Sequence, residues 1–467
     1  GCSEFLNGFG TDGLPQPLGA FALPDAWRAT GEHAKNSVKD TGCYLKTKVV
    51  FEMLHDKSCP ALRMLPVPLI ALLALGTCWR ETCGDELNAS GGAVQYHPAV
   101  TAFFESKDPF VREIVLPNIE ANRKCNADLQ VVNADGQPLP RAHVSAELNR
   151  HEFLFGHCDL ATERDPKKSK LLNILFNYTC PGNETKWRAF AKSPNENDFS
   201  KVDAMLDFCR KRDVVLEWHF LSGYHPAWLE DVTPDSEKAR FQIDNGRSVL
   251  KRYHDKVRFF QVINEDWHTH IGRAKVYADQ TTWFTELKQE FPDVDLGVCD
   301  CWSYDSKGRL PSVEELKMRY PGINFISMHA HKPRQLWASP REMYETYDPY
   351  LDTGIRIHVT EFGIILGEIT GDYRPGKWDE EKLAEYFVQA MATAYSHKAV
   401  RVFNLWSNYE KFTGNLVFTD DGEPNGKYRA IETSLLTHLS AFRSRFLSFS
   451  TRSKGTRTPA RKVPPET

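Results

Sequence analysis

Two glutamates each end a run of residues that is suited to a buried strand. Glu265 ends VRFFQVINE, and Glu361 ends IRIHVTE. Two carboxylates that converge on one concave site are the minimum requirement for glycoside hydrolysis, in which one protonates the leaving oxygen and the other attacks the anomeric carbon. A single glutamate in such a place would more often form a structural ion pair or a helix cap. The hypothesis therefore depends on the pair.

Histidine and tryptophan side chains stand near the ends of three further strand-like runs. They are His219, His329, His331 and Trp406. This arrangement favours a catalytic site over isolated structural roles. The three histidines also allow a metal-dependent hydrolase, but their separation matches no recognised metal signature. We expect no metal and no cofactor.

The residues from 153 onward alternate between apolar strand-like runs and amphipathic helical segments. This alternation predicts an α/β fold, specifically a (β/α)8 barrel whose functional groups lie at the carboxyl ends of the strands. A doubly wound sheet is the competing architecture, but GHCDLATE lacks the glycine-rich turn that often follows its first strand. The eight expected strands are 153–158, 174–180, 214–220, 257–265, 294–300, 323–331, 355–361 and 400–406.

Two of the intervening segments show a clear apolar face at helical spacing. In FSKVDAMLDFCRKRD the face comprises Val202, Met205, Leu206 and Cys209, and in KLAEYFVQAMATAY it comprises Leu383, Phe387, Met391 and Ala394.

The chain divides into six expected parts. Residues 151–436 form the catalytic barrel, and residues 129–150, with alternating polarity around a DG pair, form a small N-terminal β element. Residues 1–63 are unassigned, residues 64–79 form an apolar signal-like segment, and residues 80–128 are a linker or lead-in. Residues 437–467 form a basic, flexible tail.

Composition limits the partners and the compartment. The net charge of −4 over 467 residues gives no reason to expect nucleic acid as a partner. The apolar run and the sequons at Asn88 and Asn177 favour a secreted or extracytoplasmic protein, with membrane association only if residues 64–79 are retained. Eleven cysteines show no zinc-type CxxC pairs, and Cys299 and Cys301 form an isolated CxC. A monomer is expected.

Six motifs in order carry a family resemblance. They are FNYTCPGNETKW, WHFLSGYHPAW, QVINED, SMHAH, HVTEFGI and FNLW. Over residues of about 150 to 435 the chain resembles glycoside hydrolase family 10, the retaining endo-β-1,4-xylanases. The resemblance implies cleavage of β-1,4-linked xylan or a related plant or algal β-glycan by a two-carboxylate double displacement, with an oligosaccharide or polysaccharide as substrate.

The same resemblance assigns roles to nine side chains. It implies that Glu265 is the general acid and base and that Glu361 is the nucleophile, held by His331. The implied substrate-binding residues are Asn183, Lys186, His219, Asn264, His329, His331 and Trp406. We further expect the negative charge of Glu361 to raise the pKa of Glu265 and so keep it protonated.

The chain departs from the family pattern at several of these motifs. Gly182 stands where the family usually has glutamate, and His329 stands where it has glutamine. The tryptophan expected soon after His219 is missing, with Gly223 and Tyr224 in its place, and a second tryptophan beyond Trp406 is absent. The departures favour altered sugar specificity. An alternative is a non-catalytic carbohydrate-binding protein on a xylanase-like barrel.

Overall fold

The computed structural model describes residues 48–52, 96–124, 128–132, 152–265, 276–305, 310–331, 334–406 and 410–439. The apolar segment 64–79, most of the small β element at 129–150, and the basic tail from 440 onward lie outside these ranges. No helix in the described ranges is long and apolar enough to cross a membrane.

Eight strands close into a parallel barrel, which confirms the predicted (β/α)8 fold. The strands lie around the barrel in chain order, and each is parallel to its neighbours. Their carboxyl ends therefore share one face of the barrel. The strands are β3 (Leu154–His157), β4 (Tyr178–Thr179), β7 (Val215–Ser222), β8 (Phe259–Asn264), β9 (Asp295–Asp300), β10 (Phe325–Met328), β11 (Arg356–Phe362) and β14 (Val400–Leu405).

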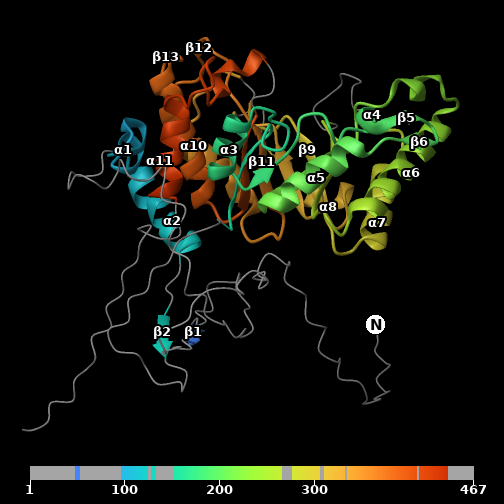
Figure 1. Cartoon of the computed structure of the whole chain (residues 1–467), viewed down its shortest axis with the longest axis horizontal. Coiled ribbons are helices and arrows are strands. Elements are labelled where there is room, and N and C mark those ends of the chain that lie inside the picture. Colours follow the sequence, from blue (N-terminus) through green and yellow to red (C-terminus); the bar gives the residue numbers. More distant parts are fainter. Residues whose placement is uncertain are drawn as a thin grey trace, which may run out of the picture. The chain divides into compact units, whose positions relative to one another are not determined.

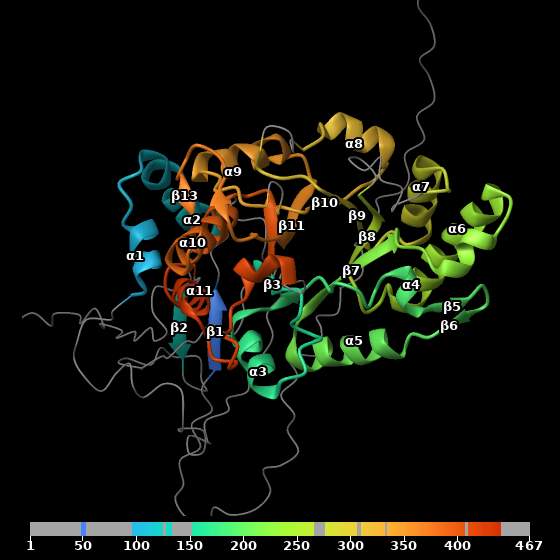
Figure 2. The same cartoon turned by 90° about the horizontal axis from the view of Figure 1, so that it is seen from above.

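Helices follow the strands and surround the barrel (Figures 1 and 2). They are α3 (Pro166–Leu175), α5 (Ser200–Arg212), α6 (Asp235–Tyr253), α7 (Gln280–Glu290), α8 (Val313–Arg319), α9 (Pro340–Tyr347), α10 (Glu380–Ser396) and α11 (Gly426–Leu436). Shorter elements in the loops are α4 (Trp187–Phe190), η3 (Ala227–Asp231), η4 (Asp348–Tyr350), η5 (Glu410–Asn415), and the hairpins β5 (Ala191–Ser193) with β6 (Glu196–Asn197) and β12 (Glu368–Ile369) with β13 (Gly376–Lys377).

The second strand is shorter than its sequence predicts. The expected run 174–180 contains Ile174 and Leu175, but these residues form the last turn of α3. The helix begins at Pro166, where Asp165 caps its first turn and proline is tolerated, and it continues through Leu175. Only Tyr178 and Thr179 remain in β4.

The helix α10 is buried on more than its expected face. Its predicted apolar residues are buried, and so is nearly every other residue from Leu383 to Ser396. The reason is a layer of N-terminal helices, α1 (Pro98–Phe104), η2 (Val111–Val115) and α2 (Leu116–Arg123), which pack against α10. These three helices lie in the range that was expected to be a linker or lead-in, and they form part of the folded unit.

One short antiparallel pair precedes the barrel in the chain. It joins β1 (Lys48–Glu52) to β2 (Asp128–Val132). The sequence predicts a strand near β2, but residues 48–52 carry no signal that identifies them as its partner.

A layer of buried polar residues crosses the barrel interior around Glu217 of β7. Its carboxylate accepts hydrogen bonds from Tyr178 (2.7 Å), Gln261 (2.6 Å) and Ser327 (3.0 Å). It also lies 2.6 Å from the Nδ1 atom of His358. Burial alone would raise the pKa of Glu217, but His358 and these hydrogen bonds lower it. The next inward-facing residue on β7, two positions on, belongs to the candidate site.

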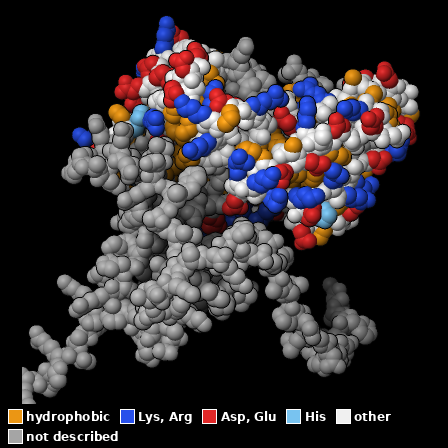
Figure 3. All heavy atoms as spheres, viewed as in Figure 1, with side chains coloured by type: hydrophobic (Ala, Val, Ile, Leu, Met, Phe, Trp, Pro, Cys, Tyr) orange, Lys and Arg blue, Asp and Glu red, His pale blue; other side chains and the backbone are white. Residues whose placement is uncertain are grey.

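Charged side chains of opposite sign are interspersed on the face of the molecule that Figure 3 shows. This mixture agrees with the small net charge of −4.

Candidate active site

Three neighbouring strands each place a polar side chain immediately beyond their carboxyl end. Glu265 follows β8, Cys301 follows β9 and His329 follows β10. The backbone N–H of Glu265 donates to the carbonyl of Cys299 (2.8 Å), and that of His329 donates to the carbonyl of Asp300 (2.9 Å). These bonds extend the barrel ladder beyond the strands, so the backbone positions of Glu265 and His329 are fixed.

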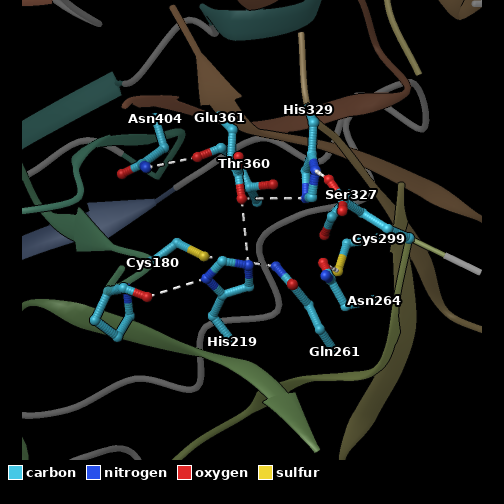
Figure 4. A network of polar contacts seen from close by, with 12 residues as sticks. Cys180, His219, Gln261, Asn264, Cys299, Ser327, His329, Thr360, Glu361 and Asn404 are labelled. Atoms are coloured by element: carbon cyan, nitrogen blue, oxygen red, sulfur yellow. Dashed lines mark hydrogen bonds and ion pairs between the residues drawn. The ribbon is translucent and has the colours of Figure 1, made fainter. Parts of the chain in front are cut away.

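The imidazole of His329 lies between the two candidate catalytic carboxylates. Its Nδ1 atom is 3.3 Å from Oε1 of Glu265, and its Nε2 atom is 3.2 Å from Oε1 of Glu361. Figure 4 shows His329 and His219 facing Glu361 from different strands. The structure thus brings the two predicted glutamates to one site, where each lies next to a different nitrogen of the His329 ring.

Glu361, the sixth residue of β11, is surrounded by histidines. Nε2 of His331 lies 2.9 Å from its Oε2, and Nε2 of His219 lies 3.3 Å from its Oε1. Burial alone would raise the pKa of Glu361, but the charge of His329 and the hydrogen bond with His331 hold it well below its usual value. The side chain is therefore ionised and fixed in place, as a nucleophile requires.

The expected electrostatics of Glu265 are wrong. Glu361 does raise the pKa of Glu265, and burial does so more strongly, but hydrogen bonds from His329 and Cys301 and the charge of His329 lower it to about 2. His329 takes up the proton instead. Burial lowers the pKa of His329, but Glu361, the nearby thiols of Cys299 and Cys301, and Glu265 hold it well above its usual value.

Two thiols line the same site, which sequence reasoning did not assign to it. Cys301 Sγ donates to Oε1 of Glu265 at 3.0 Å, and Cys299 Sγ donates to Oδ1 of Asn264 at 3.1 Å. Burial raises the pKa of Cys299 to about 12. Asn264 is the last residue of β8 and is buried. The signal for Cys301 was its place directly after the expected strand 294–300, since it was a position at a strand end that drew attention to Glu265.

Trp406 and His219 form one wall of the site. Their rings meet edge to face with centroids 5.5 Å apart. Nδ1–H of His219 donates to the carbonyl of Pro181 at 3.0 Å, which fixes the ring against the loop after β4. Burial lowers the pKa of His219, although Glu361 opposes this effect.

The two residues predicted for an outer sugar position lie in that same loop. Lys186 is buried, and its Nζ atom lies 4.6 Å from the ring centroid of Tyr224. Burial lowers the pKa of Lys186, while the charge of Glu361 raises it. Asn183 is exposed, and among the described residues no contact joins it to the carboxylate cluster.

The fold and this cluster define a (β/α)8-barrel protein with a pair of carboxylates at the mouth of the barrel. The model of Glycosyl hydrolase family 10 matches residues 146–432, and the chain therefore belongs to this family. The resemblance predicted for residues of about 150 to 435 is confirmed.

Solved structures support the same fold. The xylanase 10B of Thermotoga petrophila RKU-1, solved in complex with xylobiose, matches with a TM-score of 0.52 at 17% identity, covering 62% of this chain and 95% of that chain. The native xylanase 10B of Thermotoga maritima matches with a TM-score of 0.50 at 17% identity, covering 61% and 95%.

Curated relatives are similar over part of their length. A β-1,4-xylanase of Dictyoglomus thermophilum is 26% identical over 214 residues, which are 42% of this chain and 59% of the relative. The Anti-sigma-I factor RsgI6 of Acetivibrio thermocellus is 23% identical over 304 residues, which are 62% of this chain and 37% of the relative. The chain thus spans less than two thirds of the length of either protein.

Proposed function

We propose that the protein is a retaining glycoside hydrolase that cleaves β-1,4-linked xylan or a related plant or algal β-glycan. The observation that carries the proposal is the convergence of Glu265 and Glu361 on the two nitrogens of His329 at the mouth of the barrel. Family membership and the similarity to a protein named β-1,4-xylanase support it.

In the first step, Glu361 attacks the anomeric carbon while the leaving oxygen receives a proton. Glu361 suits this role because histidines fix its oxygens and hold its pKa low. The product is a covalent glycosyl-enzyme on Glu361. We propose that Asn264 binds the 2-hydroxyl of the attacked sugar and that His219 contacts the same sugar.

The proton for the leaving oxygen comes from His329 through Glu265. In the free protein the negative charge of Glu361 is the largest influence that raises the pKa of His329, so His329 holds the proton. As negative charge develops on the leaving oxygen, Nδ1 of His329 gives its proton to Glu265, and Glu265 passes a proton on to that oxygen.

The second step reverses this transfer. The glycosyl bond removes the charge of Glu361, so the pKa of His329 falls and the ring stays neutral. Glu265 then accepts a proton from water, which attacks the anomeric carbon and releases Glu361. The returning charge of Glu361 raises the pKa of His329 again, and the ring regains its proton.

We further propose that the outer parts of the site bind the rest of the glycan. Asn183 and Lys186 contact the next sugar, and Trp406 provides an apolar floor against which a sugar ring packs. We expect a secreted monomer that acts on polysaccharide or oligosaccharide.

The proposal is tested by incubating the full chain with a panel of soluble β-1,4 and β-1,3 glycans and identifying the released oligosaccharides. We expect release from β-1,4-xylan, and no release by the Glu265→Gln/Glu361→Gln double variant. A non-catalytic carbohydrate-binding protein would bind one of these glycans and release nothing. That result would overturn the proposal.

A further inference from the structure

Glu265, Cys301 and His329 place three different metal-binding groups at one point of the barrel rim. A carboxylate oxygen, a thiol and an imidazole nitrogen, one from each residue, all lie within 4.8 Å of one another. These are the three ligand types that Zn²⁺ takes in proteins. We infer that the three side chains form a Zn²⁺ site, and that the ion switches the active site off.

The three ligands are held close before any ion arrives. Cys301 Sγ is 3.0 Å and His329 Nδ1 is 3.3 Å from the same oxygen of Glu265. Each residue directly follows one of three adjacent strands, so small rotations of side chains on a fixed backbone suffice to close the site. Because the ligands come from separate strands, no local spacing in the sequence could reveal them.

Glu361 completes the surroundings that a zinc ligand requires. A histidine that binds zinc usually donates its other N–H to a carboxylate, which fixes its tautomer and orientation. Nε2 of His329 lies 3.2 Å from Oε1 of Glu361, which leaves Nδ1 for the ion. The thiolate also favours zinc over magnesium or calcium, which prefer oxygen ligands.

The site keeps one side open to solvent. The side chain of Glu265 is 20% exposed, whereas those of Cys301 and His329 are buried. Three protein ligands with a fourth, open position is an arrangement found in zinc sites that bind water. A second group, His219, Cys299 and His329, is equally compact, but all three of its residues are buried. It therefore offers no comparable entry for an ion.

The ion lies between Nδ1 of His329 and Oε1 of Glu265, in place of their direct contact. Binding converts the Cys301 thiol to a thiolate and releases its proton to solvent, together with any proton on Nδ1 of His329. Glu265 is then a metal ligand and can neither protonate a leaving oxygen nor activate water. This inhibitory effect rests on the proposed function, but zinc binding itself does not.

Binding is tested by calorimetric titration of the chelator-treated full chain with ZnCl₂. We expect the Cys301→Ser and Glu265→Gln variants to bind at least tenfold more weakly than wild type. Cys209→Ser is the matched control, because Cys209 is a buried cysteine on the outer helix α5. Co²⁺ added to wild type should give a thiolate-to-cobalt absorption band that is lost in Cys301→Ser and kept in Cys209→Ser.

Equal zinc affinity in wild type and Cys301→Ser, or no cobalt–thiolate band in the wild-type protein, would overturn the site. Loss of binding in Cys299→Ser with full binding in Cys301→Ser would also overturn it. The cobalt spectrum of wild type keeps the test valid even where a variant fails to fold.

Inhibition is tested with an aryl β-xyloside as substrate. Zinc should reduce the activity of wild type and Cys209→Ser, and EDTA should restore it. The remaining activity of Cys301→Ser should require at least tenfold more zinc for the same fractional loss. Unchanged or increased activity with bound zinc overturns the inhibitory role. If the metal-free protein hydrolyses no glycan but binds zinc, the proposed function is refuted and the zinc site stands. If the protein hydrolyses glycan but binds no zinc, only the zinc site is refuted.

Discussion

His329 stands where the family motif usually has glutamine, and in the proposed mechanism this one residue changes where the catalytic proton resides. Its ring contacts Glu265 and Glu361 through opposite nitrogens. A neutral glutamine could donate hydrogen bonds there, but it could not hold a positive charge between two carboxylates. The sequence identified the substitution but not its consequence, because the bridging geometry depends on three strands that are far apart in the chain.

Replacing His329 with glutamine should move the alkaline limit of activity to lower pH. In wild type the limit is set by loss of the proton from His329, whose pKa is raised well above its usual value. In His329→Gln the proton must reside on Glu265, whose pKa rises from about 2 because the charge that lowered it is gone. We expect the alkaline limb of the kcat/KM profile to shift down by about one pH unit or more.

The control for this measurement is His254→Gln. His254 is exposed at the end of α6, and the same change of side chain there should leave the profile unchanged. An identical alkaline limb in wild type and His329→Gln would show that His329 does not carry the catalytic proton.

At the scale of the elements, the barrel strands hold a layer of polar groups directly beneath the site. The periodicity of the sequence predicted all eight strands, since buried apolar runs alternate with helical faces. It did not predict that Glu217, the third residue of β7, would accept hydrogen bonds from residues of β4, β8 and β10. A strand pattern shows which residues face inward, but it does not pair them across a barrel.

Replacing Glu217 with glutamine should destabilise the protein strongly. The variant leaves His358 buried without its anionic partner, and losing one member of a buried pair costs about 3–5 kcal/mol. The free energy of unfolding, measured with denaturant at pH 7, should fall by about this amount. Glu286→Gln, which removes a partly exposed ion pair with Arg247, should cost about 1 kcal/mol or less.

The difference between wild type and Glu217→Gln should shrink in acid. Because the folded pKa of Glu217 lies below its usual value, its charge stabilises the fold above that usual value. The contribution is lost as the pH falls through the lowered folded pKa. A stability difference that stays constant down to acid unfolding would contradict this account.

At the scale of the whole molecule, the N-terminal helices belong to the barrel's folding unit. Arg123 at the end of α2 donates to the carbonyls of Tyr395 (2.5 Å), His397 (2.8 Å) and Val400 (2.9 Å), between α10 and β14. Residues 80–128 were expected to be a linker or lead-in, so these helices were not predicted. Their stability comes from packing against α10 rather than from their own pattern.

Replacing Arg123 with alanine should therefore lower the melting temperature of the entire protein in one transition. Hydrogen bonds from a charged donor contribute about 1.5–3 kcal/mol, and the three carbonyls would lose this donor. Arg112→Ala, at an exposed position of η2, should leave the melting temperature nearly unchanged. If the N-terminal helices of Arg123→Ala melt in a separate transition and the melting temperature of the barrel is unchanged, the helices and the barrel do not form a single folding unit.

Sugars on the glycone side that lie far from the cleavage point should add little to the kcat/KM of a long substrate. Gly182 removes a family carboxylate, and the ring of Tyr224 is occupied by Lys186 and Arg188, whose cationic groups lie 4.6 and 4.5 Å from its centroid. Lost contacts of this kind cost on the order of 1–3 kcal/mol. We expect kcat/KM to level off early as unbranched xylo-oligosaccharides lengthen, and a steep continued rise would refute this.

Azide rescue of the two glutamate variants tests the central claim most directly. With an activated aryl β-glycoside, Glu265→Gln should form the glycosyl-enzyme but fail to hydrolyse it, because no base activates water. Azide needs no base, so it should restore turnover and yield a β-glycosyl azide. In Glu361→Gln no covalent intermediate forms, and direct attack by azide on the vacated face should yield the α-azide. Wild-type activity in both variants, or azide products of the opposite configurations, would contradict the assignment of Glu265 as acid and base and Glu361 as nucleophile.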